Sequence, residues 1–206
     1  AQPHAVLLGL ALVGLTTILG ALYLINNIKD DTIESKMRAT IKYTALPFVA
    51  LFVTWLVILI LREGYAADSQ GVIYMEDYKY LNNLLDSPVT LIMLLAGVIL
   101  VLIAIWSGAF TKSRKGIWFG GLGTILTVMA VFFTAGYNNT AYYPSFSNIQ
   151  SSLTITNSSS SEFTLMVMSV VSLLIPFVLM YIYYAWRQMD KHAITEEEIT
   201  STEHKY

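Results

Sequence analysis

The sequence predicts an all-α integral membrane protein with five transmembrane helices. The chain has 206 residues, of which 55% are hydrophobic and only 13% charged, whereas soluble domains are about 25% charged. Its apolar residues form five stretches long enough to cross a hydrocarbon core of about 30 Å, which takes roughly 20 helical residues. These stretches are continuously apolar rather than alternating, which favours helices over a β-barrel. The predicted spans are about 5–25, 45–61, 88–106, 117–137 and 163–186.

Small residues at close spacing mark the first and fourth predicted spans. Such residues let helix backbones approach closely in lipid, so a packed bundle is expected and a partner subunit is plausible. The glycines of the fourth span follow no strand and lie inside a membrane span, which argues against a phosphate-binding loop. The small residues are Ala5, Gly9, Thr16 and Gly20 in the first span and Gly120, Gly121, Gly123, Thr124 and Thr127 in the fourth.

The second span, 45–61, is the shortest, and it gains length only if Tyr43 and Thr44 or Arg62 extend it. It is followed by a polar loop, 62–87, that mixes acidic residues with tyrosines. Interfacial tyrosines usually anchor at the headgroup level, and this role is favoured here over ligand binding. The tyrosines are Tyr65, Tyr74, Tyr78 and Tyr80.

The last span contains a proline, Pro176. Proline lacks an amide donor and displaces the carbonyl four residues earlier, so a kink is predicted at this point. The hydroxyl of Ser172 is placed to bond a backbone group that the kink frees. A kink that fits the helix to its neighbours is favoured over a gate.

The distribution of Lys and Arg predicts the orientation of the chain. Ten of the twelve basic residues lie in 26–44, in 107–116 and after the last span, and the alternate loops hold only Arg62 and Lys79. The positive-inside rule therefore places the N-terminus outside and the C-terminus in the cytoplasm. On this reading residues 1–191 are a five-helix transmembrane bundle and 192–206 a cytoplasmic tail.

The predicted spans contain few residues of the types that transfer protons, conduct ions or act in catalysis. None of the predicted spans has an ionisable residue in its interior, although proton and ion paths usually need one. The nearest are Asp86 and Glu162, which are expected in the first turns of helices, where the helix dipole stabilises an acid. No nucleophile–base pair or carboxylate pair is evident, so no catalytic residue is assigned. The net charge of −2 gives no reason to expect nucleic acid as a partner.

Metal and cofactor ligands are also scarce. The chain has no Cys, which excludes thiolate sites. His4, His192 and His204 lie at or beyond the predicted membrane edges, and methionines within spans are usually packing residues. Neither a metal site nor a haem bound wholly by this chain is expected.

A set of residues in the C-terminal third, with a second set near the N-terminus, carries a resemblance to a known family. The first set is Pro144, Ser152, Leu153, Thr154, Ser159, Ser160, Ser161, Thr164, Leu165, Met168, Pro176, Tyr181 and Trp186, followed by Ile194, Thr195 and the closing 204–206; the second is Pro3, Gly9, 20–24, Arg38 and Ala39. On these residues the chain resembles subunit II of the cytochrome bd-type quinol oxidases. The likeness extends over the whole chain and is most specific in its last third.

The resemblance implies a haem-free structural and assembly subunit of a respiratory terminal oxidase in the bacterial inner membrane. Such a complex oxidises quinol and reduces dioxygen to water, with haem b and in most members haem d carried by subunit I. The resemblance also implies that the subunit can hold a structural quinone or lipid, and it admits a small single-helix subunit as a further partner.

The resemblance implies that these five helices are the second half of a subunit with four more helices. The family's acidic and tryptophan residues linked to proton and oxygen access lie mainly in that other half, so none is assigned here. The chain also begins without Met, and it is expected to start partway through a longer protein or to belong to a split subunit. The alternative function is a component of a membrane transporter or channel, which would show polar residues or broken helices near mid-membrane; only Pro176 hints at this.

Overall fold

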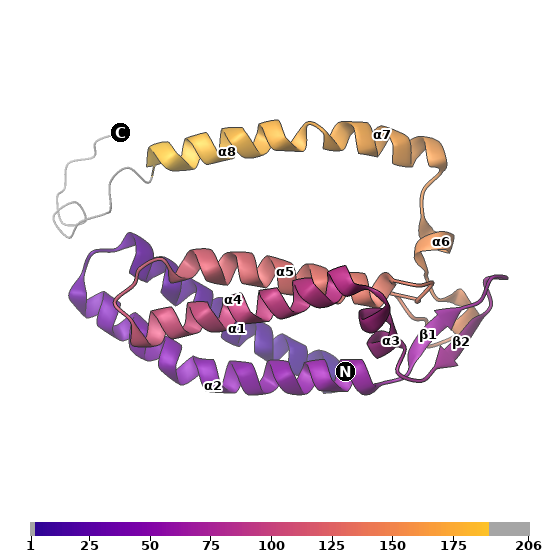
Figure 1. Ribbon diagram of the computed structural model, residues 1–206, viewed down its shortest axis with the longest axis horizontal. Coiled ribbons are helices and arrows are strands. Elements are labelled where there is room, and N and C mark those ends of the chain that lie inside the picture. Colours follow the sequence, from indigo (N-terminus) through magenta and orange to yellow (C-terminus); the bar gives the residue numbers. More distant parts are fainter. Residues whose placement is uncertain (1–2, 190–206) are drawn as a thin grey trace. The chain divides into compact units, whose positions relative to one another are not determined.

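The computed structural model describes residues 3–189, and the predicted tail 192–206 lies outside this range (Figure 1). The chain divides into two units, residues 1–157 and 158–206. The first unit holds four long helices, a small hairpin and short helical turns, and the described part of the second holds one interrupted helix. The elements are α1 (Pro3–Asn27), α2 (Asp31–Leu61), β1 (Gly64–Ala67), β2 (Ile73–Glu76), α3 (Lys79–Asp86), α4 (Pro88–Phe110), α5 (Gly116–Gly136), the 3₁₀ turn Ile149–Ser151, α6 (Ile155–Ser158), α7 (Glu162–Ser172) and α8 (Ile175–Met189).

The five predicted membrane spans are confirmed. The described chain has five helical stretches that are long and apolar enough to cross a membrane: α1, α2, α4, α5, and α7 with α8. Their ends agree with the predicted ends within four residues, with one exception. That exception is α2, which begins at Asp31 rather than near residue 45, because Asp30 caps it by accepting a bond from the Ile33 amide at 2.7 Å.

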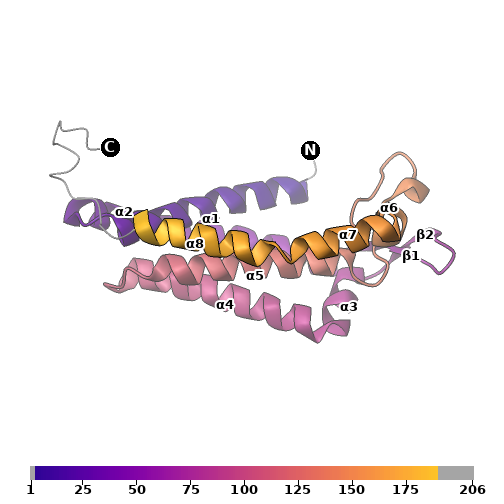
Figure 2. The same ribbon diagram turned by 90° about the horizontal axis from the view of Figure 1, so that it is seen from above.

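Each of the four long helices of the first unit runs antiparallel to the one before it in the sequence (Figure 1). The α1–α2 and α4–α5 connections therefore lie at one end, and the hairpin with α3 lies at the other, as Figure 2 also shows. The basic residues of 29–42 and 112–115 gather at the first end, whereas Arg62 and Lys79 lie at the second. Which end faces the cytoplasm stays a prediction from the positive-inside rule.

Helices α4 and α5 form the closest helix pair in the first unit, because glycines face each other where they cross. A Cβ on Gly123 would lie 2.8 Å from the Gly97 carbonyl oxygen and 2.8 Å from the Val101 amide nitrogen. A Cβ on Gly97 would lie 2.7 Å from the Thr127 amide nitrogen. At this crossing each helix packs against the backbone of the other, the arrangement that small residues permit in lipid.

Leu22 of α1 packs into a second site of small residues. Leu22 is 1% exposed. A Cβ added to Gly108 or to Gly116 would lie less than 3.0 Å from its side chain. Leu22 joins a core of α1, α2 and α4 residues that includes Ile18, Ile41 and Phe48. The predicted packing role of the fourth-span glycines is thus confirmed for Gly120 and Gly123 but not for Gly121, whose Cβ position is open.

The small residues predicted on the first span face outward instead. Gly9 and Gly20 have nothing within 4 Å of an added Cβ in the described chain, and Ala5 and Thr16 are exposed. This stripe therefore does not pack the four-helix bundle.

The segment predicted as a polar loop, 62–87, contains a hairpin and the helix α3. Strands β1 and β2 pair antiparallel, from Gly64 opposite Glu76 to Ala67 opposite Ile73. Tyr80 is wrongly predicted as a headgroup anchor: it is 6% exposed and packs with Trp55 and Leu59, because α3 lies against the bundle. Tyr74 and Tyr78 are 47% and 52% exposed, as interfacial side chains would be.

Asp86 is not a first-turn residue, because it ends α3 immediately before Ser87, the N-cap of α4. Glu162 does lie in the first turn of α7, as predicted, next to the capping residue Ser161.

The kink predicted at Pro176 is confirmed as an interruption between α7 and α8 at residues 173–174. Pro176 is the second residue of α8, where a helix tolerates the missing amide. The Leu173 amide bonds Val170 instead of Ser169, and the Ser172 hydroxyl donates to the Ser169 carbonyl at 2.6 Å. The hydroxyl therefore satisfies a backbone group that the interruption frees.

The glycine crossing predicts a position-specific response to a single methyl group. Gly123→Ala should lower the midpoint of thermal unfolding in detergent, because the methyl group meets backbone that cannot move aside; overpacking of this kind costs roughly 1–3 kcal/mol. Gly121→Ala is the matched control, because its methyl group has free space and alanine favours a helix over glycine by up to about 1 kcal/mol. Equal midpoints for the two variants would show that the crossing is not close-packed.

Candidate functional site

An apolar cavity lies between the helices of the four-helix unit and opens partly to the surface, where its wall residues Leu102 and Phe132 are 46% and 72% exposed. Its volume is about 350 Å³, and α1, α2, α4 and α5 all line it, with Ala11, Phe52 and Val101 among the wall residues. The two hydroxyl groups in the wall, of Thr124 and Thr127, donate to carbonyls of their own helix at 2.7 and 2.8 Å. The cavity therefore presents almost no unsatisfied polar group to a guest.

One polar atom near this cavity has no partner in the described chain. Trp55 lines the wall, is 4% exposed, and its indole nitrogen makes no hydrogen bond. His4 packs against it, with ring centroids 5.3 Å apart, and its Nε2 is also buried without a partner among the described residues. A donor and an acceptor thus lie unpaired in the same aromatic cluster, which Phe52 extends at 6.1 Å from Trp55.

These residues do not fit a haem. Axial ligation needs His, Met, Cys or Tyr, and none of these types lines the cavity. His4 is not a wall residue, and no group of three His, Cys, Asp or Glu that would hold a metal occurs among residues 3–189. No step of haem chemistry is therefore assigned to this chain.

At the two ends of the first unit, polar side chains form hydrogen bonds with the last backbone carbonyls of helices. Asn83 of α3 is fully buried, and its amide nitrogen donates to the carbonyls of Thr134 and Tyr137 at 2.9 and 3.1 Å and to the Thr140 hydroxyl at 2.7 Å. The last carbonyls of a helix have no partner within it. Asn83 therefore closes the C-terminal end of α5 and fixes α3 to it.

Arg38 of α2 does the same for α4 at the opposite end. Its Nη1 donates to the carbonyls of Gly108 at 2.8 Å, Ser107 at 3.4 Å and Thr111. A cation is also favoured at a helix C-terminus by the helix dipole. The orientation of Arg38 is held by Glu34, which accepts from its Nη2 at 2.7 Å.

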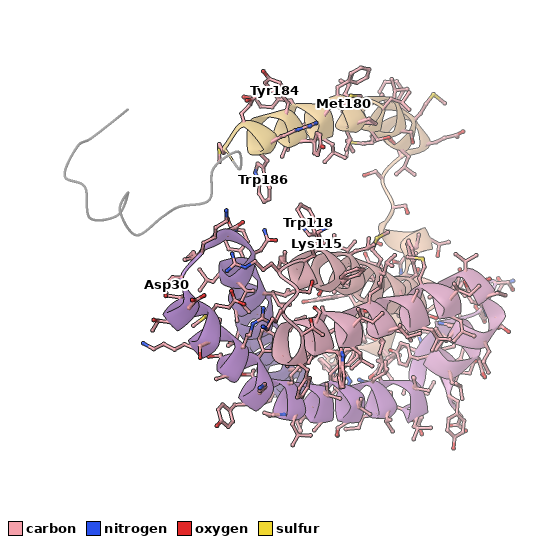
Figure 3. All side chains as sticks on the ribbon, turned by 60° about the vertical axis from the view of Figure 1, so that its left-hand side comes forward. Asp30, Lys115, Trp118, Met180, Tyr184 and Trp186 are labelled. Atoms are coloured by element: carbon pink, nitrogen blue, oxygen red, sulfur yellow. The ribbon has the colours of Figure 1, made fainter. Side chains whose placement is uncertain are left out.

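Glu34 joins the first turn of α2 to the α4–α5 connection, because its second carboxylate oxygen accepts from Arg114 of that connection. Figure 3 labels Asp30, the residue before α2, and Lys115, the residue before α5. Glu34 precedes the apolar part of α2, outside the membrane-spanning segment. The hydrogen bonds from Arg38, and then that from Arg114, hold the pKa of the Glu34 carboxyl below its usual value.

At the other end, both basic residues have structural partners. The Lys79 ammonium is 2.9 Å from a Glu76 carboxylate oxygen, and its side chain is only 5% exposed. Arg62 lies over the Tyr80 ring, 6.0 Å from the centroid. Burial raises the pKa of the Tyr80 hydroxyl, and the charge of Arg62 offsets part of that rise.

The residues that carry the sequence resemblance divide between the two units. In the first, Ser152 and Thr154 are buried and Leu153 pairs with Tyr143 through two backbone bonds, of 2.9 and 3.4 Å. The Ser152 hydroxyl accepts from the Ser145 amide at 3.0 Å, directly after Pro144, and the Thr154 amide donates to Asn157 at 2.8 Å. These residues fold one loop, and none of them lines the apolar cavity.

The remaining predicted residues lie on or beside α7 and α8. Ser160 precedes the N-cap Ser161, whose hydroxyl accepts from the Thr164 amide at 3.4 Å. Met168, Pro176 and Trp186 follow along the helices. Within its own unit this set forms a helix start and an interrupted helix rather than a pocket.

A family model described as cytochrome bd terminal oxidase subunit II matches residues 1–189. The chain belongs to this family. It is also 27% identical to the cytochrome bd-I ubiquinol oxidase subunit 2 of Escherichia coli strain K12, over 98% of this chain and 56% of the relative. The same values hold for the subunits named alike from the O6:H1 and O157:H7 strains.

Family membership and the five candidate spans make the chain a multi-pass membrane protein, which in bacteria lies in the inner membrane. The chain spans little more than half the length of the curated relatives that it matches, since the alignment covers 56% of them. The activity of a whole oxidase subunit is therefore a proposal for this chain.

Two functional features were missed in the sequence. Asn83 lies in a short helix that was predicted as loop, and only the apolar spacing of Tyr80 and Leu84 around it hints that it is buried. Glu34 was absent from the candidates, although its spacing of four residues from Arg38 is a signal of a helical ion pair.

The Glu34 cluster predicts a pH-dependent loss of stability. Because the folded-state pKa of Glu34 is lowered, its stabilisation is complete above the unfolded pKa, about 4.3, and is lost as the pH falls through the folded pKa. Glu34→Gln should lower the free energy of unfolding at pH 7 by roughly 1–3 kcal/mol, because charged hydrogen bonds are lost, and this is measured as a lower thermal midpoint.

The difference between wild type and this variant should shrink as the pH falls below about 4. Glu63→Gln is the control, because Glu63 is exposed and makes no ion pair within the described residues. A difference that stays constant from pH 7 to pH 3 would assign the effect to something other than the Glu34 charge.

Proposed function

We propose that this chain is a haem-free structural and assembly part of a cytochrome bd-type terminal oxidase, a complex that oxidises quinol and reduces dioxygen to water. The match to the subunit II family supports the assignment of the chain to this complex. The observation that carries the proposed role is the bundle interior, whose cavity wall is apolar and holds neither an ionisable side chain nor an axial ligand type. Proton transfer and haem binding need such groups at depth.

The proposed partner is the haem-bearing subunit I, with haem b and in most family members haem d. Two features support a partner in the membrane. The stripe of small residues on α1 leaves open space at Gly9 and Gly20, a surface that another helix can approach closely. The α7–α8 segment is apolar, and the described part of its own unit contains no other element to cover it. A small single-helix subunit is a further partner in this proposal.

The proposal includes a structural quinone or lipid. The cavity of about 350 Å³ and its apolar wall suit an isoprenoid or acyl chain.

The experiment that tests the function is purification of this chain from native membranes in mild detergent. The preparation is expected to contain subunit I, to show b-type haem bands in a reduced-minus-oxidised spectrum, and to consume oxygen when quinol is added. An organic extract should contain quinone or phospholipid that survives washing. A stable, pure complex without haem would overturn the oxidase role, and transport assays would then test the alternative.

A further inference from the structure

A polar groove of about 800 Å³ lies along the first turns of α2, beside the α4–α5 connection. Its α2 residues, among them Glu34, Arg38 and Lys42, are four apart and so share one face of the helix. The connection contributes Lys112. The groove is thus built from two segments far apart in the sequence and lies at one end of the first unit.

The length of α2 places this groove at the level of lipid headgroups. The helix has 31 residues, about 46 Å at 1.5 Å per residue, which exceeds a hydrocarbon core of about 30 Å. Its continuously apolar part begins near Ala45. The turns from Asp31 to Lys42 therefore project beyond the hydrocarbon, on the side predicted to be cytoplasmic.

Within the groove, positive charge exceeds negative charge. Glu34 is already shared by Arg38 and Arg114. Lys42 and Lys112 make no ion pair with a carboxylate among the described residues, and Asp31 is the one further acid in the wall. The wall holds three basic and two acidic side chains, a net charge of +1, and Arg114, which pairs with Glu34 from outside the wall, brings it to +2.

An apolar surface continues from the groove toward the membrane. The Lys42 ammonium lies 5.5 Å from the centroid of the Phe110 ring, which packs against the Trp106 ring at a tilt of 40° with the ring centroids 4.8 Å apart. Phe110 and Trp106 are 64% and 63% exposed, and Leu46, one turn beyond Lys42, is 77% exposed. A basic pocket above exposed apolar side chains matches the charged head and the acyl chains of a phospholipid.

We propose that this groove binds an anionic phospholipid, with Lys42 and Lys112 on its phosphate. Basic pockets on the cytoplasmic side of helix bundles bind such headgroups. Because Lys42 belongs to α2 and Lys112 to the α4–α5 connection, a phosphate that contacts both links the two segments beside the Glu34 ion pairs. The bound lipid therefore stabilises the same end of the unit, and the inference does not depend on the oxidase role.

The test uses the protein purified in a non-ionic detergent with the subunits that accompany it. Titration with phosphatidylglycerol should raise the thermal midpoint, since a ligand of the folded state stabilises it. Phosphatidylcholine and inorganic phosphate should raise it much less, because one lacks net charge and the other lacks acyl chains. Lys42→Gln with Lys112→Gln should weaken apparent binding about fivefold per lysine, or about 25-fold in total.

The matched control is Lys36→Gln with Lys115→Gln, which removes the same charge from the same end of the unit but from residues outside the groove. This control should keep the wild-type affinity. An equal loss in both double variants would show attraction by diffuse surface charge, and an unchanged affinity in the groove variant would also overturn the proposal. A shift of the same size with inorganic phosphate would show a free-anion site instead.

Should the groove double variant fail to fold, Lys112→Gln alone keeps the proposal testable, because Lys112 is exposed on a connection. Native mass spectrometry then counts retained phosphatidylglycerol per complex. The proposal expects less retained lipid in this variant than in Lys115→Gln, and equal retention would contradict it.

Discussion

The backbones of α4 and α5 approach each other at Gly97 and Gly123, and much of the four-helix unit depends on this contact. Lipid tails are as apolar as the helix surfaces, so burial of apolar area gives little drive for association, and close packing must supply it. The glycines allow that approach because each lacks the Cβ that would strike backbone of the other helix. Glycines also allow α1 to pack closely, because Leu22 lies against Gly108 and Gly116.

Polar chemistry in this unit is confined to the ends of helices. Arg38 and Asn83 bond the last carbonyls of α4 and α5 at opposite ends, where those groups have no partner of their own. Glu34 and Arg114 then join the α1–α2 side of the unit to the α4–α5 connection. Between these ends the helices pack through apolar side chains, and the apolar cavity has no ionisable side chain in its wall.

The helices could be predicted because apolar length decides them, and the interruption at Pro176 because proline removes a backbone donor. The start of α2 was missed because its first turns are polar and depend on the Asp30 cap and on ion pairs to other segments. Tyr80 and Asp86 were misplaced for a related reason: α3 forms against the bundle, and a sequence pattern of eight residues does not show that contact. The lipid groove needed the structure, since Lys42 and Lys112 come together only through the packing of α2 beside the α4–α5 connection.

The most direct test of whether this chain ligates a haem through histidine is to remove every histidine from the chain. The three histidines are His4, His192 and His204, and the chain has no Cys. The triple alanine variant should co-purify with the same haem-bearing partner as the wild type and keep the wild-type haem content per complex, with unchanged haem bands. Loss of one haem from an otherwise intact complex would show that this chain supplies an axial ligand, and it would contradict the account.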